Sequence, residues 1–483
     1  MKVFRPLRFI RMSQNVIFTK STTVTIHELK NRNFETRAIT SMLYRGNYDK
    51  MFYVKQSGNP NGHDALWPKE LSSQVDRRYI YLQNQQSPFG LKEQNFFSTL
   101  CNLSQGYRTK GNFPIYNSIY VKGTAVKNED ALSLLPFEND TQTSWLERIA
   151  TKTDGMDWGM MIRRFQAEST ITWKALAHWM TPFVQTHGSP LYVSSHIFLG
   201  DYQKTPFGVH KDSTGVIAFP ICGIKRLHLW KYETLVHLCQ NKSTQLSRYL
   251  DRAETISHDI DKPPDQTITM GYGDLLYWPS SMWHTGQTEN FAASLHIPIR
   301  TQASLGLLVS ELFQIPIDTM EFELVKTKIG PLNKDLLQNY IDNTIEILCS
   351  AIGGFELGSD MAKKWINSLV EAAATLGIDP LPTQAKKRQL SATTTLEGDI
   401  ALFLAYAIDH ATKELVVGLN CPPLRLPYSD ELFEFFQTLK NLPTRFTVAE
   451  AIQIFNIDNE TFSAGKHPLP QFLNLAVVNN VLT

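Results

Sequence analysis

The stretch FGVHKDSTGVIAFPICGIKRLHLW (207–230) places a polar pair, His210 and Asp212, just before two apolar runs typical of β-strands. Side chains two residues apart in a strand point to the same face, so this pair can face one interior. A second histidine, His284, lies in GYGDLLYWPSSMWHTGQT (271–288). If a later strand brings it beside the pair, two imidazoles and one carboxylate can hold a metal with open positions, which suits non-heme Fe(II) oxygen chemistry. The alternative is an ordinary buried His–Asp hydrogen bond.

Two further motifs accompany these residues. The turn Gly223-Ile224-Lys225-Arg226 follows the H-x-D pair, and Gly273-Asp274 leads through Pro279 to Trp283-His284. This succession resembles the JmjC-type branch of the cupin superfamily, the Fe(II)- and 2-oxoglutarate-dependent oxygenases. Within that branch it is similar to the ribosomal oxygenases and the asparaginyl hydroxylases. The resemblance is specific over roughly residues 190–300.

The resemblance implies a role for each motif. His210, Asp212 and His284 are the implied catalytic metal ligands for Fe(II), and Lys225 the implied anchor of the distal carboxylate of the co-substrate, 2-oxoglutarate. A lysine on a mostly apolar barrel strand is costly unless it meets a negative partner, which a bound dicarboxylate supplies. The alternative is a lysine that reaches the surface, with Arg226 facing inward instead.

Three hydroxyl residues are further candidates for binding the co-substrate. Ser294, in FAASLHIPI, resembles a hydroxyl position that assists the co-substrate in some ribosomal oxygenases; the alternative is a small residue in a packed strand. Thr214 and Tyr202 can donate to the co-substrate carboxylates or line the mouth of the site, although neither has a distinguishing spacing.

The remaining rings near these motifs have no partner motif of their own. Three histidines on strand-like runs are predicted to be structural: His196, His228 and His296. Three tryptophans are predicted to form barrel walls, and one of them can shape a substrate cleft: Trp230, Trp278 and Trp283.

Short strand-like runs separated by turn residues between 190 and 300 predict a double-stranded β-helix, or jelly roll, as the core of a catalytic domain over residues 131–300. Before it, Thr170 can begin a helix that ends near Gly188 and packs outside the barrel. The apolar residues at helical spacing are Ile171, Ala175, Leu176, Trp179, Met180 and Phe183. The insert between Glu233 and Gln266 is predicted to be helical.

Residues 1–130 mix short β-type runs with Gly, Asn and Pro, which predicts an N-terminal α/β extension and makes the whole a mixed α+β fold. The first basic residues, Lys2, Arg5, Arg8, Arg11 and Lys20, all precede the first acidic residue, Glu28. Such a start is typical of an organellar transit peptide. The plainer interpretation is a basic N-terminal strand of a cytoplasmic protein.

After residue 300 the pattern becomes helical. Two apolar stripes within 301–380 predict helices that form either core or a dimer face, and we expect a homodimer through residues 331–376. The stripes are Leu336, Leu337, Tyr340, Ile341, Ile345 and Leu348, then Trp365, Ile366, Leu369, Val370 and Ala373, begun by Ser359 and stopped by Gly377.

The last segment, residues 398–483, follows a polar loop (382–395) and resembles the winged-helix domain that ends the ribosomal oxygenases. It has a strand (ELVVGL), a helix and the capping box Thr447-x-x-Glu450. From residue 400 onward it holds five Lys and Arg against eight Asp and Glu, a net charge of −3. Because a domain that neutralises phosphates should be basic, direct nucleic-acid binding is not expected, and protein contact or packing is.

The composition of the 483-residue chain limits the alternatives. Its formal charge of +1 gives no basic field to steer nucleic acid. The five cysteines are widely spread without a C-x-x-C pair, which is typical of reduced thiols and gives no zinc framework. No apolar run approaches the ~20 residues of a membrane-spanning helix, so we expect a soluble protein without a membrane partner.

The reaction implied by the resemblance is hydroxylation of an unactivated C–H bond, with 2-oxoglutarate oxidised to succinate and CO2. The best interpretation is an amino-acid side chain in a protein or peptide as substrate. A tailoring hydroxylase of a biosynthetic peptide or small metabolite is second, an N-methyl demethylase third, and a non-catalytic cupin scaffold fourth.

Overall fold

The computed structural model describes residues 53–54, 67–72, 75, 78–235, 254–255, 260–301, 337–351, 359–379, 390–458, 460–461, 467–479 and 481–482. The basic N-terminal start and residues 382–389 of the polar loop lie outside these ranges, so the interpretations placed on them stay predictions.

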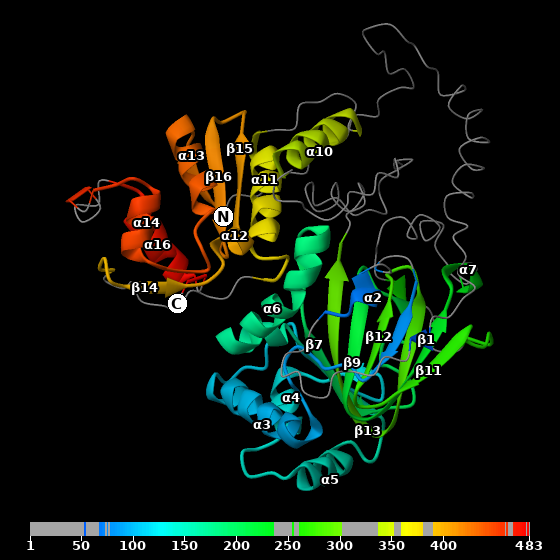
Figure 1. Cartoon of the computed structure of the whole chain (residues 1–483). Helices are drawn as coiled ribbons and strands as arrows, with labels where there is room; N and C mark the ends of the chain where they lie inside the picture. The colour runs from blue at the N-terminus through cyan, green and yellow to red at the C-terminus, as the bar shows by residue number, and fades with distance from the viewer. Residues whose placement is uncertain are drawn as a thin grey trace, which may run out of the picture. The chain divides into compact units, whose positions relative to one another are not determined.

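A large sheet forms the centre of the fold. Its strands are β1 (Tyr53–Val54), β2 (Ile80–Gln83), β3 (Ser118–Val121), β4 (Thr124–Ala125), β5 (Trp158–Arg163), β6 (Tyr192–Val193), β7 (His196–Asp201), β8 (His210–Lys211), β9 (Gly215–Trp230), β10 (Glu254–Thr255), β11 (Gln266–Met270), β12 (Asp274–Trp278) and β13 (Trp283–Arg300). Among the described residues the order is β1-β2-β12-β9-β13-β7-β5-β3-β4, with β6, β8, β10 and β11 beside this path. Figure 1 shows β7, β9, β12 and β13 side by side. All neighbours except β1 and β2 run antiparallel. This sheet with its helices confirms the predicted mixed fold with a jelly-roll core.

Strands β9 and β13 pair antiparallel along most of their length, and the pairing is irregular near Gly223. Before the irregularity Ala218 lies opposite His296, and after it Leu229 lies opposite His284. The inward face of β9 therefore changes there from even-numbered to odd-numbered residues. As a result, both halves of β9 contribute to one apolar cluster, and both halves of β13 can place polar side chains beside it.

The irregular position requires glycine. Gly223 has φ +69°, and a Cβ there would collide with the Phe291 carbonyl oxygen and lie 2.8 Å from the Ala292 Cα. We expect Gly223→Ala to lower the free energy of unfolding by about 2–4 kcal/mol, from left-handed strain plus backbone displacement. Urea denaturation measures this loss. Gly111→Ala is the matched control, since Gly111 has φ +61° with nothing within 4 Å of its added Cβ. An equal loss in both variants would show that strain alone, without the collision, sets the cost.

The helix predicted from Thr170 is confirmed as α6 (Thr170–His187). Ser169 begins it, because its Oγ accepts a hydrogen bond from the Thr172 N–H at 3.1 Å, and Gly188 with φ 88° ends it. The apolar face packs into the core that the sheet shares, with the Trp179 ring 5.9 Å from the Phe219 ring of β9.

One member of the predicted apolar face of α6 is wrong. Ile171 is 81% exposed, whereas Trp173, which the spacing analysis omitted, is buried. The Trp173 Nε1–H also donates to the Asp379 carbonyl oxygen at 2.9 Å. In the first turn of α6, Trp173 is therefore the residue that faces the core, and Ile171 faces solvent.

Residues before 131 extend the same sheet. Strand β2 pairs with β12 through Leu82 and Leu275, and β3 pairs with β5 through Ile119 and Met160. The helices of this region and the next are α2 (Lys69–Ser72), α3 (Glu93–Thr109), α4 (Asn128–Leu134), α5 (Gln142–Lys152) and the 3₁₀ turn η1 (Phe165–Glu168). The sheet thus crosses the predicted boundary at residue 130.

The insert between Glu233 and Gln266 is only partly described. Its described residues include the end of a short helix, α7 (Tyr232–Leu235), and strand β10. Thr255 of β10 pairs with His210 of β8, so this part of the insert is extended and the helical prediction is wrong for it. Pairing with a neighbouring strand satisfies backbone groups that a helix would have satisfied internally.

The C-terminal half has its own sheet and core. The elements are α10 (Leu337–Ala351), α11 (Ser359–Ala374), β14 (Thr395–Glu397), α12 (Ile400–Phe403), β15 (Leu404–Asp409), β16 (Glu414–Leu419), β17 (Leu424–Pro427), α13 (Asp430–Leu439), β18 (Arg445–Thr447), α14 (Val448–Ile454) and α16 (Leu469–Val478). Strands β15, β16 and β17 form an antiparallel sheet, and β14 pairs with β18. The predicted capping box is present, with reciprocal hydrogen bonds between Thr447 and Glu450. The winged-helix assignment stays a prediction.

The stripe of α11 and the described residues Leu337 and Ile341 of α10 are covered within the chain. Trp365, Leu369 and Val370 share one cluster with Ala405 of β15 and Val416 of β16. Of the two uses predicted for these stripes, the structure shows core. The expected homodimer through residues 331–376 stays a prediction. The residues buried in this cluster are not available to a partner, because they lie in the chain's own core.

Two general expectations can be compared with the described part of the chain. None of its helices combines the length and hydropathy needed to cross a bilayer. Of its cysteines, Cys101, Cys222 and Cys421 are free thiols.

Candidate metal centre

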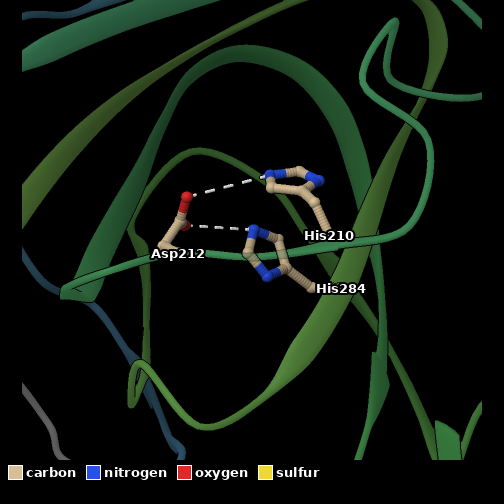
Figure 2. A group of neighbouring side chains, drawn as sticks. All are labelled: His210, Asp212 and His284. Carbon is tan, nitrogen blue, oxygen red and sulfur yellow. Dashed lines mark ion pairs between the residues drawn. The ribbon is translucent and has the colours of Figure 1, made fainter. Parts of the chain in front are cut away.

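The structure brings His210, Asp212 and His284 together, and Figure 2 shows the three side chains pointing toward one another. One ligand atom from each lies within 4.8 Å of the others. Asp212 bridges the group, with Oδ2 at 3.3 Å from His284 Nε2 and Oδ1 at 3.9 Å from His210 Nε2. Among the described residues, this is the one group of at least three His, Cys, Asp or Glu side chains that could hold a metal ion.

Strand pairing creates this arrangement. His210 begins β8 and lies opposite His284, the second residue of β13, so the imidazoles come from neighbouring strands with ring centroids 4.2 Å apart. Asp212 lies just after the end of β8 at Lys211, so it is not on the strand, yet it faces the same interior as His210, as the H-x-D pair predicted. The predicted convergence of the two segments therefore results from one antiparallel contact between β8 and β13.

The far side of each imidazole is held by the backbone. His210 Nδ1 lies 3.1 Å from the Gly208 carbonyl oxygen, and His284 Nδ1 lies 3.4 Å from that of Met282. A proton on Nδ1 that is donated to a carbonyl leaves the Nε2 lone pair free, and this is the arrangement of a metal-binding histidine. Both Nε2 atoms face Asp212, so the lone pairs converge.

The electrostatics of the group favour the metal-binding protonation states. Burial, with His284 beside it, lowers the pKa of His210 to about 4, so its imidazole is neutral at neutral pH. Burial alone would raise the pKa of Asp212, but His284 and His210 hold it well below its usual range. A neutral imidazole and an ionised carboxylate are the forms that bind a metal cation without first losing a proton.

Lys225 faces the same interior. It is 3% exposed, and its Nζ donates a hydrogen bond to Ser294 Oγ at 2.8 Å. Its neighbour Arg226 points outward and approaches Glu289 at 3.4 Å. The alternative in which Lys225 reaches the surface and Arg226 faces inward is therefore wrong, because the odd-numbered residues of this half of β9 face the interior.

Comparison with known proteins agrees with this arrangement. Residues 170–306 match the family model described as the JmjC domain. The chain contains a JmjC domain. The resemblance to the JmjC-type oxygenases is confirmed over these residues, and with it the reaction class, a 2-oxoglutarate-dependent oxygenase with Fe(II) as its metal.

Several solved structures are similar to the chain at low identity. The Escherichia coli ribosomal oxygenase YcfD has 13% identity and a TM-score of 0.43, over 86% of this chain and 97% of that one. YcfD in complex with cobalt and 2-oxoglutarate gives 12% and 0.42 over the same shares. A Sphingomonas hydroquinone 1,2-dioxygenase with 4-hydroxybenzoate bound gives 15% and 0.18, over 23% of this chain and 60% of that one. No curated protein matches the chain.

The residues of the JmjC domain fit both groups that its family uses. Two imidazole nitrogens and a carboxylate are suitable donors for Fe(II). Lys225 supplies a buried cation, and no carboxylate of a described residue forms an ion pair with it. A buried ammonium without an anionic partner is unfavourable, and the distal carboxylate of 2-oxoglutarate supplies that partner.

The other hydroxyl candidates of the JmjC domain are placed differently. Tyr202 is buried with its ring 5.9 Å from Lys225 Nζ, and burial raises the pKa of its phenol. Its backbone N–H donates to Thr288 Oγ1 at 2.9 Å, which fixes its position beside β13. Thr214 is buried just before β9 begins. Tyr202 thus lies near the lysine, and the roles of both residues stay predictions.

His296 lies beside Lys225 and Ser294, and the sequence analysis did not expect this contact. It was predicted to be structural, yet its Nε2 lies 3.0 Å from Ser294 Oγ, which also accepts from Lys225. The one available signal was spacing, because His296 follows Ser294 by two residues on a strand and must share its face.

The other rings divide between walls and the outer surface. Trp278 is buried with its ring 5.0 Å from that of His284, and Trp283 is buried against Tyr232 at 6.3 Å. The Trp230 Nε1–H donates to the Lys262 and Pro263 carbonyl oxygens. The two remaining histidines do not belong to the metal group. His196 is stacked on Phe198, and His228 bonds Thr267 on the outer side.

Proposed function

We propose that this protein is a hydroxylase of an amino-acid side chain in a protein or peptide. The main support for this proposal is that three ligand atoms lie within 4.8 Å of one another and that the buried Lys225 faces the same interior. The family resemblance of the motifs favours a protein or peptide over a free metabolite. Asp212, with its side chain 31% exposed, leaves the metal group open on one side, so a substrate side chain can enter while the rest of the substrate stays outside.

The roles of the chain's residues follow from their positions. His210, Asp212 and His284 are the proposed ligands of Fe(II) and leave its other positions for the co-substrate and O2. Lys225 binds the distal carboxylate, and Trp278 excludes water beside His284. When bound, Fe(II) and 2-oxoglutarate supply the oxidation of the C–H bond by O2, with release of succinate and CO2.

Succinate release tests this proposal. Purified protein is incubated with Fe(II), 2-oxoglutarate and O2, and wild type is compared with His210→Ala and with Glu289→Ala, an outward-facing control on β13. We expect succinate from wild type and the control only. Candidate peptides are then examined by intact mass. A gain of one oxygen supports the hydroxylase, loss of a methyl unit indicates a demethylase, and failure to bind both iron and 2-oxoglutarate would leave the scaffold.

Binding of the co-substrate should depend on pH through Lys225. Burial lowers the pKa of this lysine to about 7, so the free site loses its cation as the pH rises through that value. The affinity for 2-oxoglutarate should be level below the pKa and fall by up to about tenfold per pH unit above it. Calorimetric titration across this range measures the slope, and a level affinity on both sides would show that Lys225 stays charged or does not bind the anion.

A further inference from the structure

Three buried side chains form one hydrogen-bonded row beside the metal group. Lys225 Nζ lies 2.8 Å from Ser294 Oγ, and Ser294 Oγ lies 3.0 Å from His296 Nε2. Their exposed fractions are 3%, 0% and 9%. Lys225 comes from β9, while Ser294 and His296 are two residues apart on β13 and share its inward face.

With Lys225 as an ammonium, the direction of the first hydrogen bond is fixed, and the second can then run from Ser294 to His296. An ammonium has three donors and no acceptor, so Lys225 must donate and the Ser294 oxygen must accept. The single hydroxyl proton of Ser294 is then free to be donated to His296 Nε2. This requires a neutral imidazole with its proton on Nδ1. Burial together with the nearby Lys225 lowers the pKa of His296 well below its usual value, so the imidazole is neutral.

His296 is itself held firmly. Its ring lies 4.4 Å from the Phe198 ring of β7 and 5.7 Å from the Trp278 ring of β12. Its backbone lies in the middle of the sheet, opposite His196 on β7 and Ala218 on β9. A serine hydroxyl can rotate freely about its Cβ–Oγ bond, and a lysine has a long flexible stem. The imidazole is therefore the rigid member of the row.

We propose that His296 is a positioning residue for the co-substrate, because it takes the hydroxyl proton of Ser294 and so keeps the Ser294 oxygen turned to the Lys225 ammonium. The inference rests on the proposed function, and it identifies the ligand class as a dicarboxylate whose distal carboxylate meets the aligned ammonium. Ser294 then acts as an acceptor for Lys225, whereas the sequence analysis expected its hydroxyl to assist the co-substrate directly.

Without an acceptor at position 296 the hydroxyl proton of Ser294 loses its partner, and the Ser294 oxygen is held less firmly in place for the Lys225 ammonium. A hydrogen bond to a charged group contributes about 1.5–3 kcal/mol, so we expect His296→Leu to raise the Kd for 2-oxoglutarate roughly tenfold or more. His296→Gln offers an amide oxygen near the place of Nε2 and should restore most of the affinity. Iron binding should not change in either variant.

The first experiment titrates 2-oxoglutarate into anaerobic Fe(II)-loaded protein by calorimetry. It compares wild type, His296→Leu, His296→Gln, Ser294→Ala and the Leu/Ala double variant, with His228→Leu as a histidine control from the outer side of β9. Because Ser294 and His296 act in one row, the double variant should bind about as weakly as either single variant. Multiplied losses in the double variant, or an unchanged Kd in His296→Leu, would overturn the inference while the proposed function stands. A wild type that binds no 2-oxoglutarate would overturn both.

The second experiment needs neither metal nor co-substrate. Long-range ¹H–¹⁵N correlation spectra of wild type report which ring nitrogen of His296 carries the proton. We expect the proton on Nδ1, and a proton on Nε2 would contradict the inference even if the substituted proteins failed to fold.

In steady-state succinate release, the Leu variant should show a raised KM for 2-oxoglutarate with kcat nearly unchanged, since a merely structural defect would lower kcat as well.

Discussion

Asp212→Ala is expected to remove bound iron and succinate release together. Asp212 is the member of the group that approaches both histidines, at 3.3 Å and 3.9 Å, and its loss leaves two imidazoles without the charge that balances the cation. Changing outer partners of metal ligands already costs about 10–100-fold in affinity, so losing a direct ligand should exceed that range. Metal content after dialysis and succinate release measure the two losses.

The control for this prediction is Glu289→Ala. Glu289 is an acidic residue of β13, the strand of His284, but it faces outward and pairs with Arg226. We expect this variant to keep its iron and its turnover. An Asp212→Ala protein with a full complement of iron would mean that the metal binds elsewhere, and the assignment of the three ligands would be wrong.

Lys225→Met is expected to change stability and co-substrate binding in opposite directions. Removing one partner of a buried charged pair costs about 2–5 kcal/mol of binding, so the Kd for 2-oxoglutarate should rise roughly 30-fold to more than 1000-fold. In the ligand-free protein the same ammonium is a buried cation, and replacing it with a side chain of similar volume should leave stability unchanged or raise it. Calorimetry and urea denaturation of the two proteins measure both effects.

The size of the stability effect depends on pH. The pKa of Lys225 is lowered from 10.5 to about 7, so between these values the unfolded chain binds a proton that the folded chain does not. The contribution of Lys225 to the stability of the wild type therefore rises with pH through that window. The advantage of Lys225→Met should be largest below pH 7 and decline above it. Arg226→Ala, from the outward-facing neighbour, should show neither the loss of affinity nor this pH dependence.

The ligands could be predicted from the sequence because each depends on a local rule. Residues two apart on a strand share a face, which placed His210 with Asp212, and the motif before His284 identified the second segment. The cost of a buried ammonium predicted an anionic partner for Lys225. The structure agrees with these expectations at the level of geometry: the three donors converge and the lysine faces the same interior.

His296 could not be found in this way, because its role depends on a contact across strands. The irregular pairing near Gly223 changes which residues of β9 face inward, so alternation read from one end of the strand fails at the other. Only after that shift do Lys225 and the β13 pair of Ser294 and His296 face one another. The burial of the apolar stripe around Trp365 could not be predicted for the same reason, because the strands that cover it lie later in the chain.

The pairing of β2 with β12 has a consequence for how the protein is made. Leu82 and Leu275 lie opposite each other although nearly the whole catalytic region separates them in sequence. During synthesis, β2 emerges long before its partner, and the sheet edge beside β12 cannot close until both are present. Contacts of such long range slow folding and leave a strand edge open to association with other chains. Expression at low temperature or with chaperones should therefore improve the yield of full-length protein, and deletion of residues 1–130 should yield an aggregating product, because it removes β2, the strand that covers this edge.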